Sequence, residues 1–153
     1  MNLAYADTSL IVKSYFDEPG SAEADGVLRG LGAPLAYTPM HEVEVPNAIY
    51  LKRFRGEINE EQERVVLEAL RSDLREGLLR RPDFLDLRKV FVRAAVLAEK
   101  HSSHTGTRSL DLLHVATALE CGSADFVSYD KRQRKVAAAE GLRVMPRTLK
   151  RKV

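Results

Sequence analysis

Short apolar runs alternate with amphipathic stretches along the chain, which is the pattern of an α/β protein. Apolar residues recur at steps of three and four most clearly over residues 87–101, which predicts a helix, and the following "HSSHTGTRS" predicts a loop. Because helical stretches separate the apolar runs, we expect a parallel sheet covered on both faces. The runs that predict its short strands are residues 3–6, 34–38, 125–129 and 142–145.

Capping residues and helix breakers indicate where the expected helices begin and end. Thr38 followed by Pro39 is typical of an N-cap and a first helical position, and this helix should end at Gly56. Asn59 is a second N-cap candidate, for a long helix that ends before Pro82. The remaining expected helices span residues 8–16, 21–31, 110–121 and 131–140.

Composition is that of one globular domain, which we assign to residues 1–153, with 44% hydrophobic and 30% charged residues. The single cysteine, the lack of a long apolar run and the absence of a signal-peptide pattern predict a cytoplasmic protein with no membrane segment. The net charge of +2 does not by itself indicate a nucleic-acid partner. Basic residues do cluster over 131–135 and in the tail, residues 150–152.

Four acidic residues stand at positions where an α/β fold places functional sites. Asp7 and Asp130 each follow an expected strand and precede an expected helix, at the sheet edge where ligands bind. Either acid alone is explained as an N-cap, but two at equivalent places weaken that interpretation. Glu44 lies in the early turns of a helix, and Asp111 lies in a helix that is apolar nearly all round. A carboxylate in such a helix requires a partner.

The order and type of these motifs resemble those of the PIN-domain ribonucleases, and more closely those of the VapC-type toxins of type II toxin–antitoxin pairs. The resemblance covers the whole chain. It rests on "ADTS" with Asp7, "EVPNA" with Glu44, "GTRSLDLLHVATAL" with Asp111 and "FVSYDKR" with Asp130. It implies a three-layer α/β/α sandwich with a central parallel sheet of four to five short strands.

The resemblance also implies that Asp7, Glu44, Asp111 and Asp130 converge on Mg²⁺ or Mn²⁺ and that the protein hydrolyses RNA. Two like charges 4 Å apart repel by about 4 kcal/mol at an effective dielectric of 20, so a cluster of carboxylates needs cations or protons. Mg²⁺ usually takes one or two protein carboxylates directly. We therefore expect Asp7 and Asp111 to contact the metal, and the other two acids to act through water or a second ion.

Four further residues are candidates for contact with the substrate or support of the site. Ser9 and Ser128 offer hydroxyl groups beside Asp7 and Asp130. Lys13 and Arg108 are the basic residues placed to reach a phosphate, although surface positions explain them equally well. His114 is expected to be a packed histidine that bonds locally.

Pro46 departs from the family pattern, since it lies inside the expected helix. A proline there removes a backbone hydrogen bond and can bend the helix, so the direction of the Glu44 side chain is the least secure of the four acids. Two alternatives stay open: a PIN-fold module that binds RNA or protein without cutting, and a phosphatase that uses Asp7 as nucleophile. The sequence contains no G-x-S-x-G nucleophile motif of a serine hydrolase, no Cys or His residues at zinc-ligand spacing and no glycine-rich phosphate loop. The expected partners are RNA, a cognate antitoxin that docks on helices between residues 59 and 101, and a second copy of the chain.

Overall fold

The structure is a computed structural model that describes residues 2–149, so the basic tail lies outside the described residues. Its strands are β1 (Tyr5–Ala6), β2 (Leu35–Ala36), β3 (Leu79–Arg80), β4 (Asp125–Val127) and β5 (Arg143–Met145). Its helices are α1 (Thr8–Lys13), α2 (Ser21–Arg29), α3 (Pro39–Phe54), α4 (Glu60–Glu76), α5 (Leu87–Thr105), α6 (Ser109–Glu120) and α7 (Lys131–Ala139).

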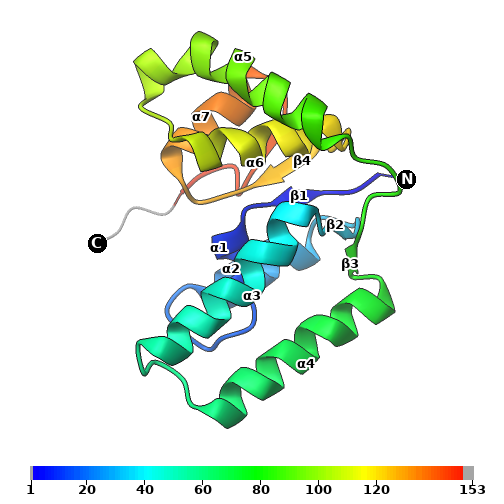
Figure 1. The fold of residues 1–153 in the computed structure, drawn as a ribbon, viewed down its shortest axis with the longest axis vertical. Coiled ribbons are helices and arrows are strands. Elements are labelled where there is room, and N and C mark those ends of the chain that lie inside the picture. Colours follow the sequence, from blue (N-terminus) through cyan, green and yellow to red (C-terminus); the bar gives the residue numbers. More distant parts are fainter. Residues whose placement is uncertain (1, 150–153) are drawn as a thin grey trace.

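All the strand pairings are parallel, as expected. β1, β4 and β5 pair in that order, β2 pairs with β3, and a bridge between Ala4 and Leu35 joins the two groups into the order β3, β2, β1, β4, β5. Figure 1 shows α5, α6 and α7 on one side of the strands and α1 to α4 on the other. The predicted three-layer α/β/α fold is confirmed.

Alternating side chains of the short strands pack into two separate hydrophobic cores. Ala4 and Ala6 pack toward α1 to α4, whereas Leu3 and Tyr5 pack toward α5 to α7. Because successive residues of a strand point to opposite faces, a run of four buried residues serves both layers. The core therefore fixes the end of β1, and with it the position of Asp7.

One strand was not predicted, and several element bounds differ from the sequence-based expectations, two helix ends among them. The strand Leu79–Arg80 was not predicted, because two residues before Pro82 carry no period that could be recognised. The expected loop from His101 begins as helix, since α5 continues to Thr105 and ends at Gly106, which has a φ of 64°. The helix after Asp7 stops at Lys13 rather than Phe16.

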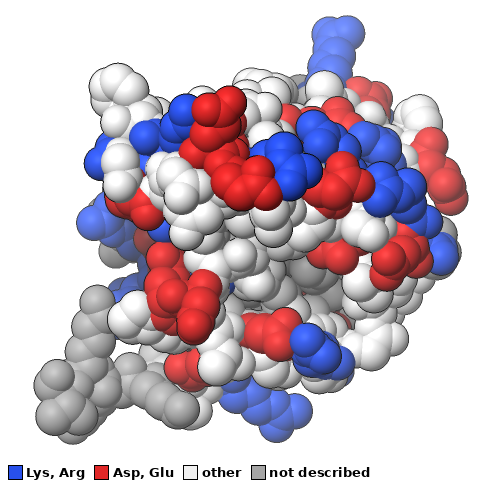
Figure 2. Space-filling model, turned by 90° about the horizontal axis from the view of Figure 1, so that it is seen from below, with Lys and Arg blue, Asp and Glu red and all other residues white. Residues whose placement is uncertain are grey.

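The outer helix α4 carries charges of both signs. Ion pairs link Glu61 with Arg64, and Glu68 with Arg71 and Arg75. Figure 2, which looks at the molecule from below, shows acidic and basic side chains interleaved over this face. Within residues 2–149, no helix has the length and apolar character needed to cross a membrane.

Candidate active site

A cavity of about 680 Å³ lies at the carboxyl ends of β1 and β4, and all four predicted acids line it. β1 ends directly before Asp7 and β4 ends three residues before Asp130, while α3 and α6 supply Glu44 and Asp111. The remaining lining residues are Thr8, Ser9, Ala48, Arg108, Ser109, Leu110, His114 and Gln133. The fold thus brings together acids that are up to 123 positions apart in the printed sequence.

Asp7 is buried and is both the N-cap of α1 and part of the cavity wall. Its Oδ1 accepts hydrogen bonds from Leu10 N at 3.0 Å and Ser9 Oγ at 2.9 Å, and its Oδ2 accepts one from Ser128 Oγ at 2.6 Å. Burial raises the pKa of Asp7, and these three donors offset only part of that rise. Oδ2 retains acceptor capacity for a cation or a water molecule.

Glu44 is held in the cavity by two donors from different elements. Its Oε2 accepts from Thr8 Oγ1 at 2.7 Å and lies 2.8 Å from His114 Nε2. Burial raises the pKa of Glu44, but the hydrogen bonds from His114 and Thr8 outweigh it and leave the pKa below its ordinary value. α3 continues across Pro46, so the proline does not turn Glu44 away from the site.

His114 is buried, as expected, but its hydrogen bonds are not local. Its Nδ1 lies 2.8 Å from Tyr5 Oη and its Nε2 faces Glu44, so the ring bridges β1, α6 and α3. With Tyr5 donating to Nδ1, the proton on Nε2 is free to bind the carboxylate. His114 therefore orients Glu44 rather than only filling the core.

His41 fixes the backbone that leads into Asp7. Its Nε2 lies 2.9 Å from the Ala6 carbonyl, and its Nδ1 lies within 3.2 Å of both the Thr38 amide and hydroxyl. Burial lowers the pKa of His41 to about 4, so the ring is neutral at pH 7. A neutral ring can donate to the carbonyl and accept from Thr38 at the same time.

Asp111 is buried near the start of α6, and only one of its two oxygens accepts a hydrogen bond within the described part of the chain. Its Oδ1 accepts from Gln133 Nε2 at 2.8 Å. Its Oδ2 accepts no hydrogen bond from the described residues but forms an ion pair with Arg108 Nε at 3.5 Å. The Arg108 side chain is 75% exposed, so it borders the cavity without filling it.

Ser128 connects the first and last acids beneath the cavity. It is fully buried, donates to Asp7 Oδ2 and accepts from the Asp130 amide at 3.0 Å. Asp130 in turn caps α7 by accepting from the amides of Arg132 and Gln133 at 2.8 and 3.0 Å. Ser128 therefore holds the acids and is too deep to contact a substrate.

The other candidate contact residues divide between the cavity and the surface near it. Ser9 and Arg108 line the cavity. Lys13 does not line the cavity. Its side chain lies over the turn at Gly20, so close that a Cβ added to Gly20 would be 3.0 Å from Lys13 Cε. Sequence reasoning missed Thr8 and Gln133, whose polar groups bind Glu44 and Asp111.

The cavity fits a hydrated divalent cation better than a fully caged one. No three His, Cys, Asp or Glu side chains within residues 2–149 form a group that could hold a metal ion as they stand. Mg²⁺ does not require such a group, since it keeps several waters and takes one or two carboxylates. Oδ2 of Asp111, which accepts no hydrogen bond from the described residues, would supply one oxygen ligand in this cavity, and Oδ2 of Asp7 would supply another.

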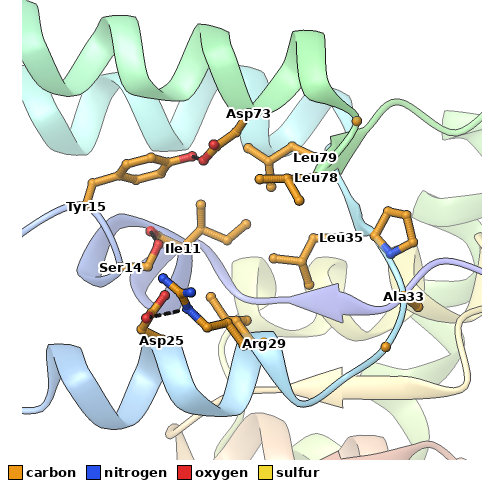
Figure 3. Close-up of a pocket in the computed structure, with 14 residues that line it drawn as sticks. Ile11, Ser14, Tyr15, Asp25, Arg29, Ala33, Leu35, Asp73, Leu78 and Leu79 are labelled. Atoms are coloured by element: carbon orange, nitrogen blue, oxygen red, sulfur yellow. Dashed lines mark hydrogen bonds and ion pairs between the residues drawn. The ribbon is translucent and has the colours of Figure 1, made fainter.

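A second cavity, of about 610 Å³, lies between α1, α2 and α4 (Figure 3). Its polar groups satisfy one another, because Tyr15 donates to Asp73 and Arg29 pairs with Asp25. Leucines from β2, β3 and the segment before β3 line much of the rest. Since its acids are paired and it lies away from the carboxyl ends of β1 and β4, it is not the candidate active site.

The fold and the acid-lined cavity define an α/β protein with a carboxylate site at the ends of its parallel strands. The family model of the PIN domain matches residues 4–139, and the chain belongs to the PIN-domain family. This confirms the PIN-domain part of the resemblance recognised from the four motifs. PIN domains are generally nucleases, and PIN nucleases usually use divalent metals.

Among solved structures, the chain is similar to one described as FitAcB from Neisseria gonorrhoeae. The two share 17% sequence identity with a TM-score of 0.63, over 93% of this chain and 96% of that chain. At this identity the likeness establishes the fold alone. No curated protein matches the chain.

Proposed function

We propose that the protein is an Mg²⁺- or Mn²⁺-dependent endoribonuclease of the VapC type, the toxin of a toxin–antitoxin pair. The observation that carries the proposal is a cavity lined by Asp7, Glu44, Asp111 and Asp130, in which the buried Oδ2 of Asp111 has no hydrogen bond within residues 2–149 and is balanced there only by an exposed arginine, Arg108, at 3.5 Å. A buried carboxylate oxygen without a hydrogen bond is costly, and a bound cation would reduce that cost. The resemblance of the four motifs to VapC-type toxins adds the substrate class and the biological role.

Asp111 and Asp7 would hold the cation, with Glu44 and Asp130 facing it from α3 and the start of α7. When bound, the cation supplies Lewis-acid activation of water and charge neutralisation at the scissile phosphate. The chain's own groups fix these acids in advance: Thr8 and His114 hold Glu44, Ser128 and Ser9 hold Asp7, and Gln133 holds Asp111. This arrangement reduces the reorganisation that catalysis would otherwise require.

Basic side chains at the rim support an anionic substrate. Arg108 is exposed beside Asp111, and Lys131 and Arg132 are exposed next to Asp130. Arg108 lines the acidic cavity and the other two follow Asp130 in the chain, which supports a phosphate backbone held beside the cavity while its scissile group reaches the acids. Ser9 is the lining hydroxyl that remains a candidate for substrate contact, and Lys13 is the least favoured of the contacts proposed from the sequence.

An antitoxin and a second copy of the chain are the proposed protein partners. α5 exposes Phe91, Val92 and Val96, and a cavity of about 620 Å³ runs along this helix between Asp86 and Glu120. Exposed apolar side chains close together are typical of protein interfaces. Cys121 is a free thiol, which fits the reducing cytoplasm proposed for the protein.

The test is incubation of the purified protein with a mixed RNA pool in Mg²⁺ or Mn²⁺, beside an EDTA arm and an Asp111→Asn variant. Cleavage that requires the metal and Asp111 is the expected result. Cleavage that survives both EDTA and the substitution would contradict the proposal. Tight RNA binding without cleavage would instead favour the alternative of a PIN-fold binding module, which the lack of a complete three-ligand group makes worth testing.

A further inference from the structure

Gln133 is a buried amide in the wall of the acid cavity. It lies in the first turn of α7 and is only 5% exposed. Its Nε2 donates to Asp111 Oδ1 at 2.8 Å, but its Oε1 is buried and has no hydrogen-bond partner among the described residues. An unmet buried acceptor costs about 1–3 kcal/mol, so an amide used at one end only needs an explanation.

The same wall contains a second oxygen that accepts no hydrogen bond from residues 2–149, although Arg108 lies 3.5 Å from it. Asp111 Oδ2 is buried and lacks a hydrogen bond within the described residues, while its Oδ1 is held by Gln133. Two linked side chains from α6 and α7 thus each have one oxygen without a hydrogen bond, as far as the chain is described, in the wall of the same cavity. A hydrated divalent cation satisfies both oxygens together, since it binds carboxylate oxygen directly and its waters donate hydrogen bonds.

We propose that Gln133 is a positioning residue of the cation site. Its Nε2 fixes the Asp111 carboxylate so that Oδ2 is left for the cation, and its Oε1 accepts a hydrogen bond from a water of the cation's hydration shell. The inference rests on the function proposed above. It extends that function by adding an uncharged residue from α7 to the four acids of the motifs.

The chemistry explains why an amide stands at this position. An apolar side chain of the same size would leave Asp111 Oδ1 as well as Oδ2 without a donor. A glutamate would place two carboxylates within hydrogen-bond distance, an arrangement stable only with a cation or a shared proton between them. Glutamine is the neutral side chain of this length that donates to the carboxylate and still offers an oxygen.

Mn²⁺ binding measured without RNA by titration calorimetry tests the proposal, together with thermal unfolding in EDTA and in Mn²⁺. The variants are Gln133→Met, which keeps the size but removes both polar groups, and Gln133→Glu, which keeps an oxygen and adds charge. Gln62→Met is the matched control, because Gln62 is the other glutamine of the chain and lies exposed at the start of α4.

We expect Gln133→Met to weaken Mn²⁺ binding by about 10- to 100-fold, the range for residues that orient metal ligands. Gln133→Glu should unfold at a lower temperature than the wild type in EDTA, and Mn²⁺ should raise its unfolding temperature by more than it raises that of the wild type. A purely structural glutamine would not produce this metal-dependent reversal. Gln62→Met should bind Mn²⁺ like the wild type.

Two results would overturn the proposal in distinguishable ways. If Gln133→Met binds Mn²⁺ like the wild type while Asp111→Asn does not, Gln133 has no part in the site and the proposed function stands. If the wild type itself binds no Mn²⁺ at millimolar concentration, both fail. Should Gln133→Met not fold, the Gln133→Glu comparison decides, because equal Mn²⁺ stabilisation of that variant and the wild type would also reject the proposal.

Discussion

Asp7→Asn separates the charge of Asp7 from its role as a helix cap. Asparagine is as good an N-cap as aspartate, and its Oδ1 can keep the hydrogen bonds from Leu10 N and Ser9 Oγ. The substitution removes the buried negative charge, and it also replaces Oδ2, the acceptor of the Ser128 hydroxyl, with an amide nitrogen that can donate to the Ser128 oxygen. We therefore expect Asp7→Asn to abolish metal-dependent cleavage while the protein stays folded, the pattern of a residue kept for function at the expense of stability.

The contacts of Asp7 determine how much stability the comparison variant, Asp7→Ala, should lose. Asp7→Ala removes the cap of α1, which costs about 0.5–2 kcal/mol. It also leaves the buried Ser128 hydroxyl without its acceptor, which costs about 1–3 kcal/mol. Allowing for non-additivity between neighbours, Asp7→Ala should lower the free energy of unfolding by about 2–4 kcal/mol. Asp7→Asn should lower it by less, or not at all.

The pH dependence of stability shows whether the buried charge of Asp7 stabilises or destabilises the fold. Burial raises the pKa of Asp7 above its ordinary value of 3.8, so the folded protein favours the protonated carboxyl. The contribution of Asp7 to stability is therefore fully present below pH 3.8 and is lost as pH rises through the raised pKa. Asparagine does not titrate. The free energy of unfolding of the wild type minus that of Asp7→Asn should fall as pH rises and then level off.

Urea unfolding of both proteins in EDTA from pH 3.5 to 8 measures this difference, and groups common to both cancel. A difference that rises with pH would refute the reasoning. It would mean that the ionised carboxylate is stabilised by its three donors more than it is destabilised by burial, as for an ordinary exposed cap.

Three other substitutions test separate parts of the structure. Ser128→Ala should lower the free energy of unfolding by about 2 kcal/mol, because it removes a hydrogen bond to Asp7 and leaves the Asp130 amide unpaired; a loss under 0.5 kcal/mol in urea unfolding would contradict this. His114→Leu should reduce cleavage of RNA by about 10- to 100-fold, because Glu44 loses a donor, and an unchanged rate would show that Glu44 needs no positioning. Leu97→Ala should cost about 2–5 kcal/mol of stability by opening a cavity in the core, with the cleavage rate per folded molecule unchanged; a reduced rate would show that α5 also shapes the site.

Local signals in the sequence predicted the elements that carry the site. Thr38 and Pro39 begin α3 and Asn59 caps α4, as predicted, because caps and proline act within one helical turn. Asp7 and Asp130 are N-caps, which was one of the two interpretations weighed for them, and both also line the cavity where a functional role was predicted. An N-cap at the carboxyl end of a strand necessarily lies at the sheet edge where sites form.

Long-range contacts escaped prediction because nothing local encodes them. Gln133 directly follows the basic pair Lys131–Arg132, a context that predicts a surface position, yet α7 packs it against Asp111. His114 bonds Tyr5, 109 positions away, and not a neighbour on its own helix. The strand Leu79–Arg80 exists only because β2 lies beside it, since a two-residue strand has no period of its own. These features depend on which elements meet, and a single sequence does not specify that pairing.

The central claim is that the acids of this cavity bind a divalent cation. A crystal structure of the wild type soaked in Mn²⁺ and measured for anomalous scattering tests it most directly. The expected result is an anomalous peak within about 2.2 Å of Asp111 Oδ2, inside the cavity that Asp7, Glu44 and Asp130 also line. An empty cavity at millimolar Mn²⁺, or a peak held only by surface carboxylates elsewhere, would contradict it.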